Sequence, residues 1–149
     1  MQSMPLRALE RPMTLDAVES HGHIAIDHAN PDHARVVLVD WMLGNAYNFA
    51  CSYCPANLHD GSIRWQTKDV VLAAFDAIQA HYVQGMGRNV WIQFTGGEPT
   101  MHPRILDLLD AASLRGFSVS LISNASRTYR FWQKIAPHLS SVILTYHAE

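Results

Sequence analysis

The chain alternates between continuous apolar runs and segments in which apolar residues recur every three or four positions. The apolar runs are rich in β-branched residues and predict buried strands. These strands fall near residues 36–43, 89–95, 117–124 and 140–147. The segments with helical spacing lie between the strands and are bounded by glycine or proline, and Thr67 is placed to cap the first of them. They predict helices near residues 67–85, 102–116 and 127–139.

The regular alternation of strand and helix indicates the fold class. Parallel strands joined by right-handed crossover helices produce this order, so the sequence predicts an α/β fold. Residues 35–149 carry about four strand–helix units, whereas a closed barrel takes about eight strands. We therefore expect a partial barrel, truncated after its last strand, and the alternative is a small four-stranded sheet complete in itself. Residues 1–34 are predicted to be an N-terminal extension.

Composition and charge restrict the class of partner. Hydrophobic residues make up 48% of the 149 residues, which is enough for one packed domain. The formal net charge of −2 predicts binding to neither nucleic acid nor an anionic membrane. No apolar run reaches the roughly 20 residues of a membrane span, so we expect a cytoplasmic protein. A less favoured metal site, lacking matching thiols or carboxylates, would use His21, His23, His28 and His33.

The only two cysteines, Cys51 and Cys54, lie in the loop that follows the first predicted strand. Active sites of α/β proteins lie at the carboxyl ends of the strands, which makes this loop the favoured site. Two thiolates at this spacing can bind a soft metal or an iron–sulfur cluster. A redox-active dithiol and two inert cysteines are the alternatives that the spacing leaves open.

A second group of candidate residues follows the second predicted strand. Gly96 and Gly97 allow the backbone to approach a ligand closely, and the Glu98 carboxylate is an acceptor for an amine. The same residues are also typical of a tight turn that requires positive φ angles, so the turn alone does not decide between the two roles.

Taken together, the two loops resemble those of the radical S-adenosylmethionine (radical SAM) superfamily. Residues 48–54 read Asn-Phe-Ala-Cys-Ser-Tyr-Cys, and residues 96–99 read Gly-Gly-Glu-Pro about forty positions later. The family's first loop reads Cys-x3-Cys-x-aromatic-Cys. The resemblance extends roughly over residues 36–149 and implies a partial barrel of the radical SAM type, with a 4Fe-4S cluster and S-adenosylmethionine as cofactors.

For the cluster, the resemblance implies that Cys51 and Cys54 are metal ligands. The first ligand position, four residues before Cys51, is Tyr47. A phenol has a pKa near 10 and is a hard oxygen donor, so Tyr47 is a poor substitute for a thiolate on a cluster iron. Three interpretations remain open. They are a substitution in a competent enzyme, a natural relative that has lost the cluster, and a cluster completed by Tyr47 or by a histidine.

For S-adenosylmethionine, the resemblance implies contacts from all three loops. Tyr53 would lie near the adenine. Residues at the glycine turn would bind the methionine amine, and these are Gly96, Gly97, Glu98 and Pro99. Ser123 and Asn124, at the end of the third predicted strand, would contact the cofactor from the rim of the sheet. The alternative role for Ser123 and Asn124 is to cap the helix that follows.

The activity implied by the resemblance is radical enzymology. One-electron reduction of S-adenosylmethionine would give methionine and a 5'-deoxyadenosyl radical, which abstracts hydrogen from a substrate. The substrate would be a small molecule or a peptide, and a flavodoxin or ferredoxin would be the reductant. The alternative function is a non-catalytic half-barrel without a cluster, which binds a nucleotide or another protein. An exposed apolar edge at residues 142–144 also predicts self-association.

Overall fold

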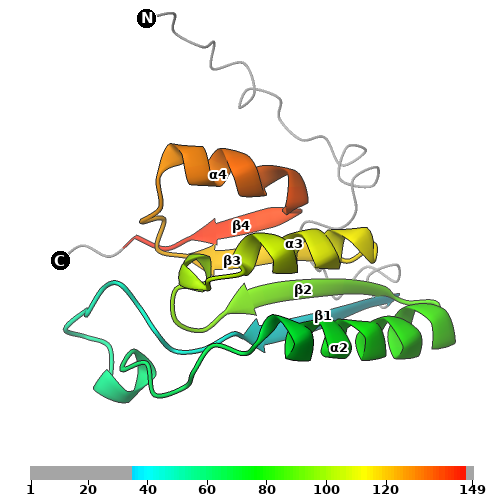
Figure 1. The fold of residues 1–149 in the computed structure, drawn as a ribbon, viewed down its shortest axis with the longest axis horizontal. Helices are drawn as coiled ribbons and strands as arrows, with labels where there is room; N and C mark the ends of the chain where they lie inside the picture. Colours follow the sequence, from blue (N-terminus) through cyan, green and yellow to red (C-terminus); the bar gives the residue numbers. More distant parts are fainter. Residues whose placement is uncertain (1–34, 147–149) are drawn as a thin grey trace, which may run out of the picture.

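A computed structural model describes residues 35–146 of the chain. Its four strands form one sheet in the order β1-β2-β3-β4, and every neighbouring pair is parallel (Figure 1). The strands are β1 (Val36–Met42), β2 (Asn89–Thr95), β3 (Ser118–Ser123) and β4 (Ser141–Leu144). The predicted α/β class and all four predicted strands are therefore confirmed. The predicted N-terminal extension, residues 1–34, lies outside the described residues.

The helices lie where the sequence predicts them but are shorter. They are α2 (Lys68–Ile78), α3 (Ile105–Leu114) and α4 (Tyr129–Ile135). A π-helical segment, Gln79–Gly85, continues α2, and a 3₁₀ turn over residues 136–138 continues α4. Thr67 occupies the N-cap position of α2, but its hydroxyl makes no capping hydrogen bond. The Thr128 side chain does cap α4, accepting from the Phe131 N–H.

The core lies between the sheet and the helices. Strands added in sequence order through right-handed crossovers place the connecting helices on the same face of the sheet. Apolar side chains from α2, α3, β2 and β3 are fully buried there, and they include Val71, Phe75, Leu108, Leu109, Ile92, Phe94, Val119 and Leu121. The ring of Phe75 packs edge-on against Trp41 and Phe117. This packing fixes the strands whose carboxyl ends carry both sequence motifs.

The opposite face of the sheet carries polar pairs. Asp40, Gln93 and Ser120 occupy one register row across β1, β2 and β3. The Gln93 amide donates to the Asp40 carboxylate at 2.6 Å, and the Trp91 indole N–H donates to Ser120 Oγ at 2.8 Å. The alternation of side chains along each strand thus separates an apolar helix-facing side from a more polar side.

The outer strand β4 exposes its apolar side chains. Val142, Ile143 and Leu144 are 40%, 48% and 56% exposed, respectively. β4 pairs with β3 on one side, and among residues 35–146 no strand pairs with its other side. Such an edge is a template for pairing with another strand. Self-association of the chain stays a prediction.

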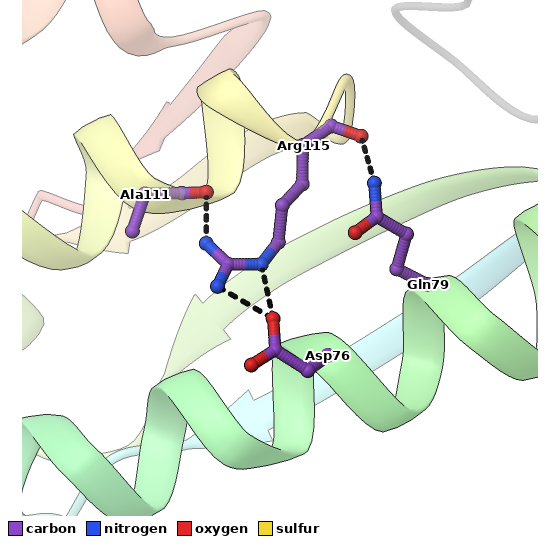
Figure 2. Close-up of polar contacts among 4 residues, drawn as sticks. All are labelled: Asp76, Gln79, Ala111 and Arg115. Carbon is purple, nitrogen blue, oxygen red and sulfur yellow. Dashed lines mark hydrogen bonds and ion pairs between the residues drawn. The ribbon is translucent and has the colours of Figure 1, made fainter.

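Arg115 joins the two helices that cover β1, β2 and β3. Its guanidinium donates twice to Asp76 Oδ1 on α2, at 2.6 and 2.9 Å, and once to the Ala111 carbonyl on α3 at 2.8 Å (Figure 2). The Arg115 carbonyl in turn accepts from the Gln79 amide at 3.3 Å. The Arg115 side chain is 20% exposed but Asp76 is 65% exposed, so the ion pair is open to water and the bond to the Ala111 carbonyl is the better shielded of the two contacts.

We predict that Arg115→Met lowers the free energy of unfolding by about 1 kcal/mol, because it removes a part-buried bond to the α3 backbone together with a solvent-exposed ion pair, which contributes little. Urea denaturation measures the change. Arg130→Met, at an exposed position of α4, is the matched control and should be nearly neutral. An equal effect of the two substitutions would contradict a role for Arg115 in joining α2 to α3.

Candidate functional site

The loop that carries the cysteines, residues 44–66, is held at the carboxyl rim of the sheet by Asn45. The Asn45 side-chain amide donates to the Asn57 carbonyl, Asp60 Oδ1 and Ser62 Oγ at 3.0, 2.9 and 3.2 Å. Its oxygen accepts from the Ile63 N–H at 2.8 Å. Asn45 is buried, and its side chain fastens the first arm of the loop to the returning arm, residues 57–63. Sequence reasoning missed Asn45, because nothing in its local pattern distinguishes it from a solvated loop residue.

The glycine turn packs against this loop. Gly96 and Gly97 have φ angles of 76° and 59°. A Cβ on Gly96 would lie 2.1 Å from Met42 Cγ, and one on Gly97 would lie 2.3 Å from the Ala46 carbonyl oxygen. Both the left-handed backbone and the close approach to the chain's own atoms therefore require glycine at these positions. The tight-turn role of the two glycines is confirmed, while their contact with a ligand stays a prediction.

Glu98 is 0% exposed, and its carboxylate accepts four hydrogen bonds from the chain's own donors. Oε1 accepts from the Thr100 N–H, the Thr100 hydroxyl and the Ser123 hydroxyl at 3.1, 2.6 and 2.8 Å. Oε2 accepts from the Asn124 N–H at 2.8 Å. The neighbouring Pro99 is buried in the 3₁₀ turn over residues 99–101. Contacts of Glu98 and Pro99 with the methionine amine stay a prediction.

Ser123 and Asn124 do not cap α4, whose N-cap is Thr128. The helix-capping alternative is therefore wrong for both residues. Besides bonding Glu98, the Ser123 hydroxyl accepts from the Ala125 N–H at 3.1 Å. The Asn124 side chain donates to Asn48 Oδ1 in the cysteine loop at 2.9 Å. These bonds connect the end of β3 to both sequence motifs.

A small cavity of about 60 Å³ lies between the cysteine loop and the end of β3. Its lining combines aromatic rings, two thiols, an imidazole and an amide, from Tyr47, Phe49, Cys51, Tyr53, Cys54, His59 and Asn124. A turn in which the Cys54 N–H donates to the Cys51 carbonyl brings both free, half-buried thiols into this lining. The structure thus places Tyr47, Cys51, Tyr53, Cys54 and Asn124 together, as predicted. It adds Phe49 and His59.

A larger cavity lies at the opposite end of the sheet, among the amino ends of the strands. Its volume is about 400 Å³, and residues such as Val36, Asn89, Phe117 and His138 line it. None of the residues of the two sequence motifs lines it. Because α/β proteins bind their ligands at the carboxyl ends of parallel strands, the smaller cavity is the candidate site.

Tyr47 is a protonated phenol in this setting. Burial raises the pKa of Tyr47 above its ordinary value near 10, and the negative charges that Cys54, Glu98 and Cys51 can carry raise it further. These charges act on Tyr47 because its ring shares the cavity with both sulfurs. The Tyr47 side chain therefore shares the cavity with both thiols in its neutral form at pH 7.

The residues present do not fit a cluster held by three thiolates. Cys51 and Cys54 supply two soft donors, and Tyr47 supplies a hard, protonated oxygen. Within residues 35–146, no three side chains of the His, Cys, Asp or Glu type lie together in an arrangement suited to a metal ion. His59, the histidine in the cavity lining, has its ring Nε2 at 3.3 Å from the Cys54 carbonyl oxygen. The alternative N-terminal histidine site lies outside the described residues.

The cavity lining fits part of a nucleoside. Aromatic rings can stack on a purine, and the Asn124 amide can both donate and accept hydrogen bonds. The volume of about 60 Å³ is well below the roughly 300 to 1,000 Å³ of sites that enclose a whole small molecule. This cavity by itself would therefore hold only part of such a ligand.

The fold and this rim define an α/β protein with a partial, parallel-stranded barrel and a site at the carboxyl ends of its strands. The model of the family described as the Radical SAM superfamily matches residues 44–145, more than half of the chain. The chain therefore belongs to the radical SAM superfamily. A search among curated proteins gives no match.

Among solved structures, the chain is similar to the crystal structure of BtrN in complex with AdoMet and 2-DOIA. The TM-score is 0.63 at 14% sequence identity, and the match covers 75% of this chain and 46% of the BtrN chain. The likeness shows a common fold, and the chain spans less than half of the length of that relative. Within residues 35–146, none of the helices is both long and apolar enough to cross a membrane.

Proposed function

We propose that the carboxyl rim of this sheet binds S-adenosylmethionine, and that the chain is the amino-terminal part of a radical SAM enzyme core. The observation that carries the proposal is the shared cavity, in which Tyr53 and the two thiols face Asn124 from a distant part of the sequence. The AdoMet complex of BtrN, a relative of the same fold, supports the choice of ligand.

The chain's own residues would bind and orient the ligand. Tyr53 would stack on the adenine, and Asn124 would bond to the nucleoside from the opposite wall. Cys51 and Cys54 occupy two of the three ligand positions of the family's 4Fe-4S cluster, which supplies the electron that cleaves S-adenosylmethionine. Because Tyr47 does not fit the third position, we propose radical chemistry only for a chain with cysteine at residue 47. A reductant such as a flavodoxin or ferredoxin, and a small-molecule or peptide substrate, would then be its partners.

Binding of S-adenosylmethionine to the full chain, measured by isothermal titration calorimetry, tests the proposal. We predict that Tyr53→Ser weakens binding by about tenfold or more, because stacking on a base contributes about 1–3 kcal/mol. Tyr129→Ser is the matched control, since Tyr129 is 69% exposed on α4 and Tyr53 is 60% exposed. Absence of binding to the unchanged chain, or equal losses in the two variants, would refute the proposed site.

A second candidate function is favoured by Tyr47. A half-barrel with an incomplete ligand set would serve as a nucleotide-binding or protein-binding module without a cluster. Anaerobic reconstitution of Tyr47→Cys with iron and sulfide distinguishes the two candidates. A brown variant whose spectrum responds to S-adenosylmethionine supports the enzyme core, whereas a colourless variant that still binds the nucleotide supports the module.

A further inference from the structure

Glu98 is a buried carboxylate without a cationic partner among the described residues. The ion pairs within residues 35–146 involve Asp76, Asp107 and Asp110, and none of them includes Glu98. Four hydrogen bonds from the protein compensate for the burial instead. A carboxylate buried in this way is costly unless its hydrogen bonds are kept, so the arrangement around it is strongly constrained.

The bonds of Glu98 connect all three loops at the rim. Its backbone N–H donates to the Ala46 carbonyl in the cysteine loop at 2.9 Å. Its side chain bonds Ser123 and Asn124 at the end of β3. The Asn124 side chain donates in turn to Asn48 Oδ1, so the end of β3 is also bonded to the cysteine loop.

This last connection joins the two walls of the cavity. Asn48 stands between Tyr47 and Phe49 in the sequence, and both of these residues line the cavity on one side. Asn124 lines it on the other side. The position of Asn124 depends on the bond from its N–H to Glu98 Oε2, the only bond that this oxygen accepts from residues 35–146.

We propose that Glu98 is a positioning residue for the nucleoside part of the ligand, acting through Asn124 and Asn48, rather than a ligand of the methionine amine. The inference rests on the proposed binding of S-adenosylmethionine. Glu98 would therefore affect the affinity for the nucleoside, which is the part of the ligand next to the aromatic lining. The carboxylate itself is 0% exposed, so it offers no surface to an amine.

The variant Glu98→Gln isolates this role. A glutamine of nearly the same size has one acceptor oxygen and one donor NH₂ group. If the oxygen replaces Oε1, the NH₂ group faces the Asn124 N–H; if it replaces Oε2, the NH₂ group faces the Thr100 N–H. In either orientation the NH₂ group of glutamine faces a backbone N–H, so two donors point at each other. That N–H loses its acceptor, and we expect the loops around residue 98 to shift.

The test compares two probes that share the nucleoside, S-adenosylmethionine and 5'-methylthioadenosine, which lacks the amino-acid part. We expect Glu98→Gln to weaken binding of both probes by about tenfold or more, measured by isothermal titration calorimetry on the full chain. A control variant, Ser120→Ala on β3, removes the buried hydrogen bond that Ser120 accepts from Trp91 on β2, away from the rim. It should lower the melting temperature and leave both affinities unchanged.

Other outcomes overturn the inference. Loss of S-adenosylmethionine binding with unchanged 5'-methylthioadenosine binding would make Glu98 an amine ligand, and unchanged binding of both would remove its role altogether. If Glu98→Gln fails to fold, Asn48→Ala breaks the same connection at an exposed residue and should weaken both probes. Retention of both affinities by Asn48→Ala would refute the connection. If the unchanged chain binds neither probe, the proposed function itself fails.

Discussion

Replacement of Tyr47 by cysteine should convert the rim into an iron–sulfur site. After anaerobic reconstitution with iron and sulfide, Tyr47→Cys is expected to retain about four irons per chain and to show broad visible absorption, whereas the unchanged chain retains little iron. The physical reason is the donor set. A thiolate is a soft ligand for a cluster iron, and the phenol of Tyr47, with its pKa raised by burial, stays protonated at neutral pH.

We expect iron retention to depend on where the third thiol is placed, and not only on the presence of three thiols. Phe49→Cys also adds a third thiol to the lining of the same cavity, but off the ligand pattern, and serves as the matched control. Iron content and absorption of the three chains are compared after gel filtration. A gain in Phe49→Cys as large as that in Tyr47→Cys, or no gain in Tyr47→Cys, would show that residue 47 does not correspond to the family's first ligand.

Gly97→Ala should have the largest effect on the fold of the rim. The substitution places a Cβ at 2.3 Å from the Ala46 carbonyl oxygen and holds alanine at a φ of 59°. We expect the free energy of unfolding to fall by about 2–4 kcal/mol, with loss of S-adenosylmethionine binding because the cysteine loop is pushed away from the turn. Urea denaturation and calorimetric titration measure the two effects.

The matched control for Gly97→Ala is Gly116→Ala. Gly116 has a similar φ of 75°, but no atom lies within 4 Å of a Cβ placed there. Its substitution should cost only the strain of a left-handed alanine, about 1–2 kcal/mol, and leave ligand binding intact. Equal stability losses in the two variants would mean that the cysteine loop can move away from the added Cβ at position 97 without lowering the free energy of unfolding further.

The α/β class, the four strands and the placement of both motifs at the carboxyl ends of strands could be predicted from local sequence. The apolar residues of β2 and β3 are largely buried, and the boundaries of both strands nearly match the prediction. The helix α2 is shorter than predicted because the helical spacing of apolar residues continues through Gln79–Gly85, where the chain adopts π-helical geometry. Apolar periodicity does not distinguish such a segment from a regular α-helix.

The connections within the site could not be predicted, because they join residues that are far apart in the sequence. Glu98 and Asn124 are separated by 26 positions, and Asn48 and Asn124 by 76. A motif indicates which side chains stand near one another, but the hydrogen bonds of a carboxylate depend on which donors the fold brings to it. For this reason the sequence predicts Glu98 as an acceptor for a ligand, whereas in the folded chain its carboxylate accepts four hydrogen bonds from the protein itself.

The pair formed by Asp40 and Gln93 has a consequence for whatever covers that side of the sheet. A carboxylate in the middle of a strand, bonded at 2.6 Å to one amide, keeps further lone pairs that need water or other donors. An aliphatic layer laid over it would strip that hydration without replacement. The part of this face around Asp40 and Gln93 is therefore suited to hydrated or hydrogen-bonding occupants, whereas the main apolar cluster lies on the face that the helices cover.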